Sequence, residues 1–116
     1  MNLTSVRYQD NCIYIGLNGS QDKRENGAIQ KNIRSVYLVY KIKAFDRQVR
    51  ETVLIDKRDI FIKGQKILLK LELNELWHPE ECEFELMSLK FTYVSGKIKH
   101  LKIGRSFRFL EICYST

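Results

Sequence analysis

The feature that most constrains this chain is a period-two alternation of apolar and polar residues that recurs along most of its length. Between Val36 and Phe45, apolar residues occupy every second position, and the intervening positions become charged toward the end of the segment. The segments Ile67–Leu73 and Met87–Tyr93 show the same alternation. Because successive side chains of a strand point to opposite faces, this pattern indicates strands with one face in the core and one in water. A helix would scatter the same apolar residues around its circumference.

Weaker segments of the same kind fill most of the remaining chain. They are Thr4–Tyr8, Cys12–Leu17, Val49–Ile55, Ile60–Lys63 and Phe107–Tyr114. Turn residues separate them near 9–11, 45–47 and 63–65, and two longer loops are expected at 18–32 and 74–83. Turns at intervals of roughly 8–12 residues are typical of sandwiches and small barrels. The sequence therefore predicts a single domain, residues 1–116, that is all-β, an Ig-like antiparallel β-sandwich of eight or nine short strands, with a small barrel as the alternative.

Two segments resemble bacterial FxLYD-type Ig-like domains. The first runs from Asn32 to Asp46 and ends in Ala44-Phe45-Asp46, and the second is Lys63-Gly64-Gln65 leading into 66–71. In those domains a strand with a leucine-tyrosine-aspartate end is followed by a Pro-Gly-Gln-like turn into the next strand. Here Lys63 stands in place of the proline, and the aromatic-aspartate end matches in part. The resemblance covers about a third of the chain and implies an Ig-like sandwich of the kind that serves as an accessory or binding module in envelope proteins.

Charge is segregated along the chain. The total is +6, from 20 Lys and Arg against 14 Asp and Glu. Residues 72–85 hold six acids and no Lys or Arg, whereas residues 86–116 hold six basic residues and one acid, Glu111. Such segregation predicts a dipolar surface that orients a charged partner or attracts a second copy of the chain. The other interpretation is that the strands present solvated polar faces whose signs happen to cluster.

Basic residues converge on a predicted hairpin whose turn is Ser95-Gly96. A two-residue turn would place Thr92 opposite Lys99, with Lys90 and Lys97 on the same exposed face. Like charges packed across strands are mildly destabilising, which suggests an anionic partner. The predicted partner-binding residues are Lys90, Thr92, Lys97, Lys99, Lys102, Arg105, Arg108 and Trp77. Two alternatives stay open: the lysines protect an edge sheet against aggregation, and Trp77 caps the core.

These observations predict a non-catalytic module that recognises a protein partner through a basic sheet surface and loops. A copy of the chain itself is one candidate partner. The alternative is a nucleic-acid-binding small β-barrel of the oligonucleotide-binding kind, which would stack bases on aromatic side chains. Its candidate aromatic residues are Tyr37, Tyr93, Phe107 and Phe109, most of which alternate in phase with apolar stripes and are therefore better explained as core residues.

Signatures of catalysis and of cofactors are missing from the sequence. It contains no GxxxxGK, GxGxxG, HExxH or GxSxG motif. His78 and Cys82 have the spacing of a local nucleophile pair, but such a pair needs a third group to orient the base. Cys12, Cys82 and Cys113 form no CxxC. We therefore expect no enzymatic activity, no cofactor and no metal.

Cysteine usage and hydropathy also bear on the compartment. A disulfide between Cys12 and Cys113 is geometrically conceivable if the terminal strands are neighbours, although reduced thiols are the default without a secretion signal. No window approaches 18 consecutive apolar residues, and the start of the chain lacks the basic and apolar run of a signal peptide. The sequence thus predicts a cytoplasmic protein with no membrane span, and a trimmed secreted form would have the same appearance.

Overall fold

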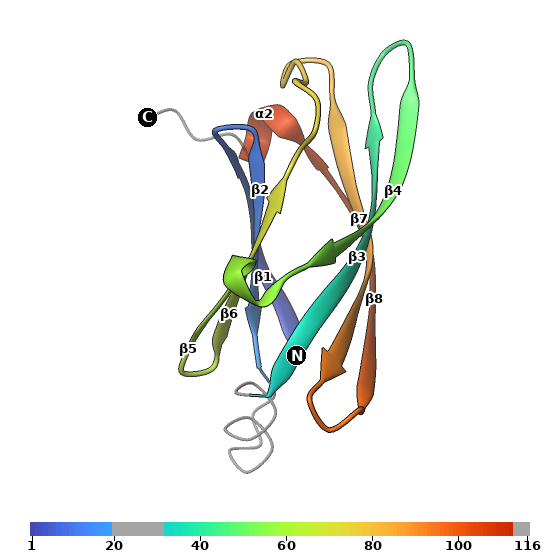
Figure 1. Ribbon diagram of the computed structural model, residues 1–116. Helices are drawn as coiled ribbons and strands as arrows, with labels where there is room; N and C mark the ends of the chain where they lie inside the picture. The colour runs from blue at the N-terminus through green and yellow to red at the C-terminus, as the bar shows by residue number, and fades with distance from the viewer. Residues whose placement is uncertain (20–31, 113–116) are drawn as a thin grey trace.

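The chain folds into two antiparallel β-sheets that pack face to face, as a computed structural model of residues 1–19 and 32–112 shows (Figure 1). The first sheet has the order β1 (Asn2–Gln9), β2 (Cys12–Asn18), β6 (Lys66–Glu72) and β5 (Ile60–Lys63). The second sheet has the order β4 (Gln48–Ile55), β3 (Ile33–Lys43), β7 (Glu83–Tyr93) and β8 (Ile98–Arg108). The predicted all-β sandwich is confirmed, and the two separate sheets replace the closed barrel that was its alternative.

The chain passes from one sheet to the other between β2 and β3, between β4 and β5, and between β6 and β7. The short 3-10 helix η1 (Lys57–Asp59) makes the second of these connections. Hairpins join the remaining neighbours. In the β1–β2 turn, Asp10 and Asn11 have φ values of 52° and 60°, as both central residues of a type I′ hairpin turn require. The Asn11 side-chain amide also donates to the Leu73 carbonyl at 3.0 Å, which fastens this turn to the end of β6.

The core lies between the sheets and is built from the stripes that the alternation predicted. Each of the following side chains has a relative exposure of 1% or less: Ile13, Ile15, Leu17, Ile67, Leu69 and Leu71 in the first sheet, and Val36, Leu38, Ile42, Phe84, Leu86, Leu89 and Phe91 in the second. Burial of one such side chain stabilises the fold by about 1.5–3 kcal/mol relative to its exposure. The interior of the sandwich is therefore the main source of stability.

The prediction of a final strand over Phe107–Tyr114 is wrong. Strand β8 ends at Arg108, and the helical turn α2 (Phe109–Ile112) follows it; residues 113–116 lie outside the described part of the chain. The Phe109 ring is fully buried, 5.0 Å from the Tyr8 ring and 6.4 Å from the Phe84 ring. Because this ring packs between the two sheets, the chain leaves the sheet at Phe109, and the tertiary contact overrides the local strand pattern. Most of the predicted 18–32 loop also falls outside the described residues.

Gly16 in β2 is required by the close approach of β1. The pairing of these strands shifts between Leu3 and Ser5, and a Cβ built on Gly16 would clash with Ser5 Oγ and lie 3.0 Å from Thr4 Oγ1. We expect Gly16→Ala to lower the free energy of unfolding by about 1 kcal/mol, the low end for overpacking because the serine hydroxyl can rotate. Urea unfolding measures this change. Ser5→Ala should restore most of the lost stability in the Gly16→Ala background, and an equally stable single variant would contradict the close approach.

Candidate functional site

The hairpin between β7 and β8 has a three-residue turn, so the predicted two-residue turn is wrong. The backbone N–H of Tyr93 donates to the Lys97 carbonyl at 2.9 Å, which leaves Val94, Ser95 and Gly96 in the loop. Gly96 has a φ of 87°, as the last position of a three-residue hairpin loop requires. Side chains alternate with a period of two, and a shift of one residue therefore moves the β8 side chains to the opposite face.

The observed register changes which basic residues share a face. Lys90 lies opposite His100, and both point away from the core. Lys99 lies opposite Phe91, whose ring is fully buried, so the half-buried Lys99 side chain is on the inner face. Lys90 and Lys99, which the two-residue turn would have placed together, therefore lie on opposite faces of the second sheet.

The two predicted arginines, Arg105 and Arg108, follow a bulge in β8 and lie on opposite faces because they are three residues apart. The pairing of β7 with β8 shifts just after Leu86, where β8 contains Gly104 with a φ of 61°. Beyond the bulge, Arg105 lies opposite the buried Leu86, and its guanidinium carbon is 5.4 Å from the centroid of the Phe107 ring. The predicted residues thus divide into three groups: the outer face has Lys90, Thr92, Lys102 and Arg108, the inner side has Lys99 and Arg105, and the turn has Lys97.

One row of side chains crosses the whole outer face of the second sheet. Leu54 pairs with Tyr37, Tyr37 with Lys90, and Lys90 with His100, so the row runs through β4, β3, β7 and β8. Leu54 is 50% exposed and Tyr37 is 40% exposed. The Lys90 Nζ lies 5.7 Å from the centroid of the Tyr37 ring, within the range of a cation–π contact. We call this set, Leu54, Tyr37, Lys90 and His100, the central row.

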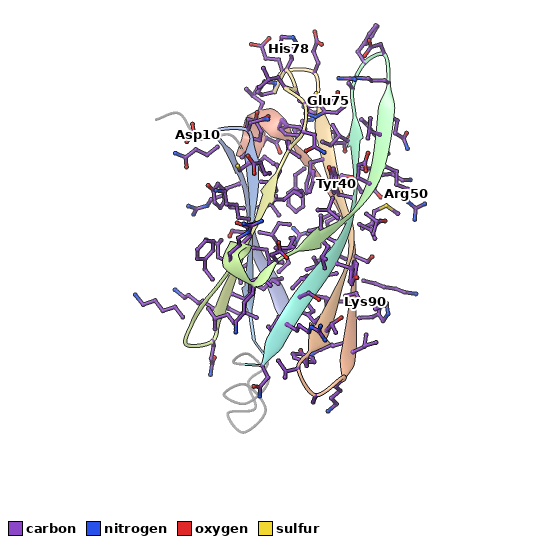
Figure 2. The ribbon with its side chains drawn as sticks, viewed as in Figure 1. Asp10, Tyr40, Arg50, Glu75, His78 and Lys90 are labelled. Atoms are coloured by element: carbon purple, nitrogen blue, oxygen red, sulfur yellow. The ribbon has the colours of Figure 1, made fainter. Side chains whose placement is uncertain are left out.

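The outer face around the central row has more cations than acids. The strand pairing places Lys41, Lys43, Arg50, Lys90, Lys102 and Arg108 on it, with the acids Glu83 and Glu85. Within residues 1–19 and 32–112, the one ion pair on this face joins Lys43 Nζ to Glu85 Oε1 at 3.5 Å. Figure 2 shows Lys90 and Arg50 pointing away from the other sheet, whereas Tyr40 points into the space between the sheets. This face therefore presents unpaired cations beside an exposed aromatic ring.

Trp77 caps the core from the β6–β7 loop, which is the alternative that the sequence left open. Its side chain belongs to the buried cluster and is only 8% exposed, so it does not serve as a surface anchor. The Arg47 guanidinium carbon lies 4.2 Å from the centroid of the indole ring, and Arg47 Nη1 is 2.8 Å from Glu75 Oε2. The neighbouring Leu76 is 81% exposed.

The sequence did not single out Tyr37 and Arg50 as parts of one site, because their segments are far from the basic hairpin. Tyr37 was weighed as a stacking residue but assigned with the other aromatic residues to the core. Tyr93 and Phe109 are buried as that interpretation requires, and Phe107 is half-buried. One signal in the sequence distinguishes Tyr37 from the core aromatic residues. It occupies an odd position of the strand, whereas the apolar stripe that begins at Val36 occupies the even positions.

The Cys82 thiol of the Cys82 and His78 pair lies in an environment that disfavours its reactive form. Burial raises the pKa of the Cys82 thiol, and the nearby Glu81 carboxylate raises it further. A raised pKa lowers the population of thiolate, which is the reactive form.

Burial likewise raises the pKa of the Cys12 thiol. Cys12 forms no disulfide among the described residues, and Cys113, with which a disulfide was conceivable, falls outside them. Nowhere in 1–19 or 32–112 do three or more His, Cys, Asp or Glu side chains gather as a metal site.

A separate groove of about 600 Å³ lies on the outer face of the first sheet, above Gly16. Arg7 of β1 lines one side, and Phe61 and Leu68 line the other. The volume suits a small ligand. Its lining also includes the polar residues Thr4, Ser5 and Asn18, and its lysines, Lys63 and Lys66, are exposed and lie opposite each other in the β5–β6 hairpin. The central row, in which Lys90 contacts the Tyr37 ring, is the better-defined candidate site.

Together, these observations describe an all-β sandwich of two sheets, with the exposed Tyr37 ring and several Lys and Arg side chains on the outer side of the second sheet. Comparison of the chain with protein-family models, with curated proteins and with solved structures finds no match. Among the described residues, no helix combines the length and the apolar character that crossing a membrane requires. The segments that carry the FxLYD resemblance form β3 with the turn after it and the β5–β6 hairpin.

Proposed function

We propose that this protein is a non-catalytic binding module that recognises the acidic surface of a protein partner through the outer face of the second sheet. The observation that carries this proposal is the central row, in which Lys90 lies over the exposed Tyr37 ring. Two further cations of the same face, Arg50 and Lys102, form no ion pair with a described residue. A neighbouring row, Thr52, Val39, Ser88 and Lys102, continues the polar surface. The resemblance to FxLYD-type domains, which are generally binding modules, agrees with this class of function.

The proposed binding combines the positive charge of this face with one aromatic side chain, Tyr37, that loses its water when the partner binds. Cations on one face steer an acidic partner toward it and penalise basic competitors. Tyrosine and arginine are enriched among the residues that dominate binding energy, and Tyr37 with the exposed Leu54 offers the apolar contact that charge alone lacks. The flat outer face of a sheet suits a macromolecular surface better than a small molecule.

Binding of single-stranded nucleic acid through the same face is the second candidate, and the observation that favours it is Tyr37. An exposed aromatic ring on an open sheet, flanked by cations, is the arrangement on which single-stranded bases stack. The Lys90 ammonium covers part of that ring, which favours a protein carboxylate over a base. Salt separates the two candidates, since phosphate contacts release counterions and affinity then falls steeply as salt rises.

The test is capture of partners from an extract by the wild-type protein and by Lys90→Glu/Lys102→Glu, each with and without nuclease. We expect capture of a protein by wild type, its retention after nuclease, and a loss of about tenfold or more in the variant. The matched control is Lys63→Glu/Lys66→Glu, which makes the same change in charge at exposed positions of the first sheet.

Three outcomes decide between the candidates. If the variant and its matched control both capture the partner as well as wild type does, the outer face is not the binding site. Capture that disappears with nuclease would favour nucleic acid, and a steep salt dependence of binding to a single-stranded oligonucleotide would support that function directly. Loss of capture in both variants would show that net charge, rather than this face, determines binding.

A further inference from the structure

We propose that this protein assembles head to tail with copies of itself, the tip of the β7–β8 hairpin of one copy seating in a groove at the opposite end of the next. The two end surfaces share no residue with the central row. The assembly therefore does not depend on the central row, although Lys43 and Arg108, which line the groove, also lie on the outer face of the second sheet. It adds a second interface whose partner is this same chain.

The most exposed large apolar side chains lie at the two ends of the sandwich. Phe45 is 95% exposed, Leu76 81% and Leu110 63%, and Figure 1 shows that the β3–β4 turn, the β6–β7 loop and α2, which carry them, lie together at one end. Val94, 68% exposed, lies in the β7–β8 turn at the other end. Exposed apolar residues that gather in this way mark interaction sites rather than scattered surface positions.

One end of the sandwich is concave. A groove of about 510 Å³ runs between the β3–β4 turn and α2, and its lining includes Phe45, Leu110, Glu80, Glu81, Glu83 and Arg108. Backbone hydrogen bonds hold both walls: the Ala44 N–H donates to the Arg47 carbonyl at 2.8 Å, and the Phe109 N–H donates to the Cys82 carbonyl at 3.1 Å. We call this concavity the acidic groove.

The acidic groove has unpaired negative charge. Of its two lining cations, Lys43 forms the ion pair with Glu85, and Arg108 lies opposite Glu83 in the β7–β8 ladder without an ion pair between them. No ion pair of the described residues includes Glu80 or Glu81. The groove therefore suits a partner that brings a cation between apolar side chains.

The hairpin tip has that composition. Lys97 is exposed, and it lies between Val94, 68% exposed, and Ile98, 52% exposed. The Lys97 N–H donates to Ser95 Oγ at 3.4 Å within the turn. A convex tip with one cation between two aliphatic side chains is thus complementary to a groove with apolar walls and two unpaired carboxylates, and burial of the apolar contacts would strengthen the attraction between the charges.

Geometry makes this contact intermolecular and open-ended. Strand β7 begins with Glu83 at the acidic groove and ends with Tyr93 at the tip, a span of roughly 36 Å for 11 strand residues. The longest extent of the molecule is 46 Å, against 27 and 23 Å in the other directions. A tip therefore cannot reach its own groove. Two different surfaces in contact form a heterologous interface, which leaves a free tip and a free groove on every assembly and propagates into a chain.

The test is sedimentation velocity of the full chain across a hundredfold range of concentration, with one variant blocked at each end. Val94→Ser/Lys97→Glu blocks the tip, and Glu80→Lys/Glu81→Lys blocks the acidic groove. We expect wild type to form larger species as concentration rises. Each blocked variant should associate at least tenfold more weakly. A mixture of the two variants should form a one-to-one dimer and nothing larger, since it contains one usable tip and one usable groove.

Wild type that stays monomeric throughout the range would overturn the proposal, as would assembly that survives in both blocked variants. A mixture that forms no dimer would overturn it as well, because it would show that the two surfaces do not meet. Thermal unfolding confirms that the exposed substitutions leave the fold intact. Lys90→Glu/Lys102→Glu is the control for the binding face: assembly should be unchanged in it, so that failure of the proposed function and failure of this assembly give different results.

Discussion

We expect Phe109→Ala to lower the free energy of unfolding by about 3–5 kcal/mol, the range for removal of a fully buried phenylalanine ring. The ring contacts Tyr8 of the first sheet at 5.0 Å, edge to face, and Phe84 of the second sheet at 6.4 Å. Its loss would leave a cavity where the two sheets meet α2, and the two aromatic contacts would be lost with it. Urea unfolding followed by circular dichroism measures the change.

Glu111→Ala in the same helical turn is the control for this measurement. Glu111 is exposed, and a substitution there should change stability by no more than about 0.5 kcal/mol. A loss below about 1 kcal/mol for Phe109→Ala would mean that α2 does not close the core, because a peripheral ring can be truncated at that cost. The comparison distinguishes the contribution of the helical turn to stability from the contribution of the Phe109 ring.

Stability should fall steeply with pH above about 10 because the pKa values of two tyrosines are raised in the folded protein. Burial raises the pKa of Tyr93, and burial with the Glu51 and Glu75 carboxylates raises the pKa of Tyr40. The folded protein then keeps two phenolic protons that the unfolded chain releases at its ordinary pKa. Stability is complete below that pKa and is lost as pH rises toward the folded values, with a slope of up to about 1.4 kcal/mol per pH unit for each tyrosine.

Urea unfolding between about pH 9 and about pH 11 measures this slope. The raised pKa values of the Cys12 and Cys82 thiols act in the same direction, so the tyrosine part is obtained by difference. Tyr40→Phe and Tyr93→Phe should each flatten the slope, and Tyr37→Phe, at an exposed position, is the comparison variant. The Tyr93 hydroxyl has no hydrogen-bond partner among the described residues, so Tyr93→Phe should be at least as stable as wild type at neutral pH. An unchanged slope in both Phe variants would contradict the prediction.

Alternation was enough to predict the sandwich because the inward stripes are nearly pure. Ile67, Leu69 and Leu71 are all buried, and a pattern of that quality fits only one face of a strand. The length of a turn, in contrast, cannot be predicted from the alternation of the strands beside it. Ser95-Gly96 is compatible with a two-residue or a three-residue loop, and the choice depends on whether Val94 pairs or joins the turn. That single residue decided whether Lys99 faced solvent, and neighbouring residues carry no signal for it.

The rest of the candidate site depended on packing between distant segments. Gly104 lies at the β8 bulge, but a single glycine in a strand does not predict which of the following side chains change face. Trp77 was correctly placed in a loop, yet its burial under Arg47 arises from a contact between the β3–β4 and β6–β7 connections. The central row needed the register of all four strands of the second sheet. Sequence reasoning therefore found the cations but not the aromatic residue beside them.

The strand order also determines how fast this chain can fold. The molecule consists of four local hairpins, β1–β2, β3–β4, β5–β6 and β7–β8, which are joined into sheets by only two ladders, β2 with β6 and β3 with β7. Isolated hairpins form in about 1–10 μs. In the β2–β6 ladder, Cys12 pairs with Glu72, so about half of the chain must be closed into a loop before this ladder can form. We therefore expect hairpins to form early and the two joining ladders to limit the rate, which puts folding in the millisecond to second range of sandwiches.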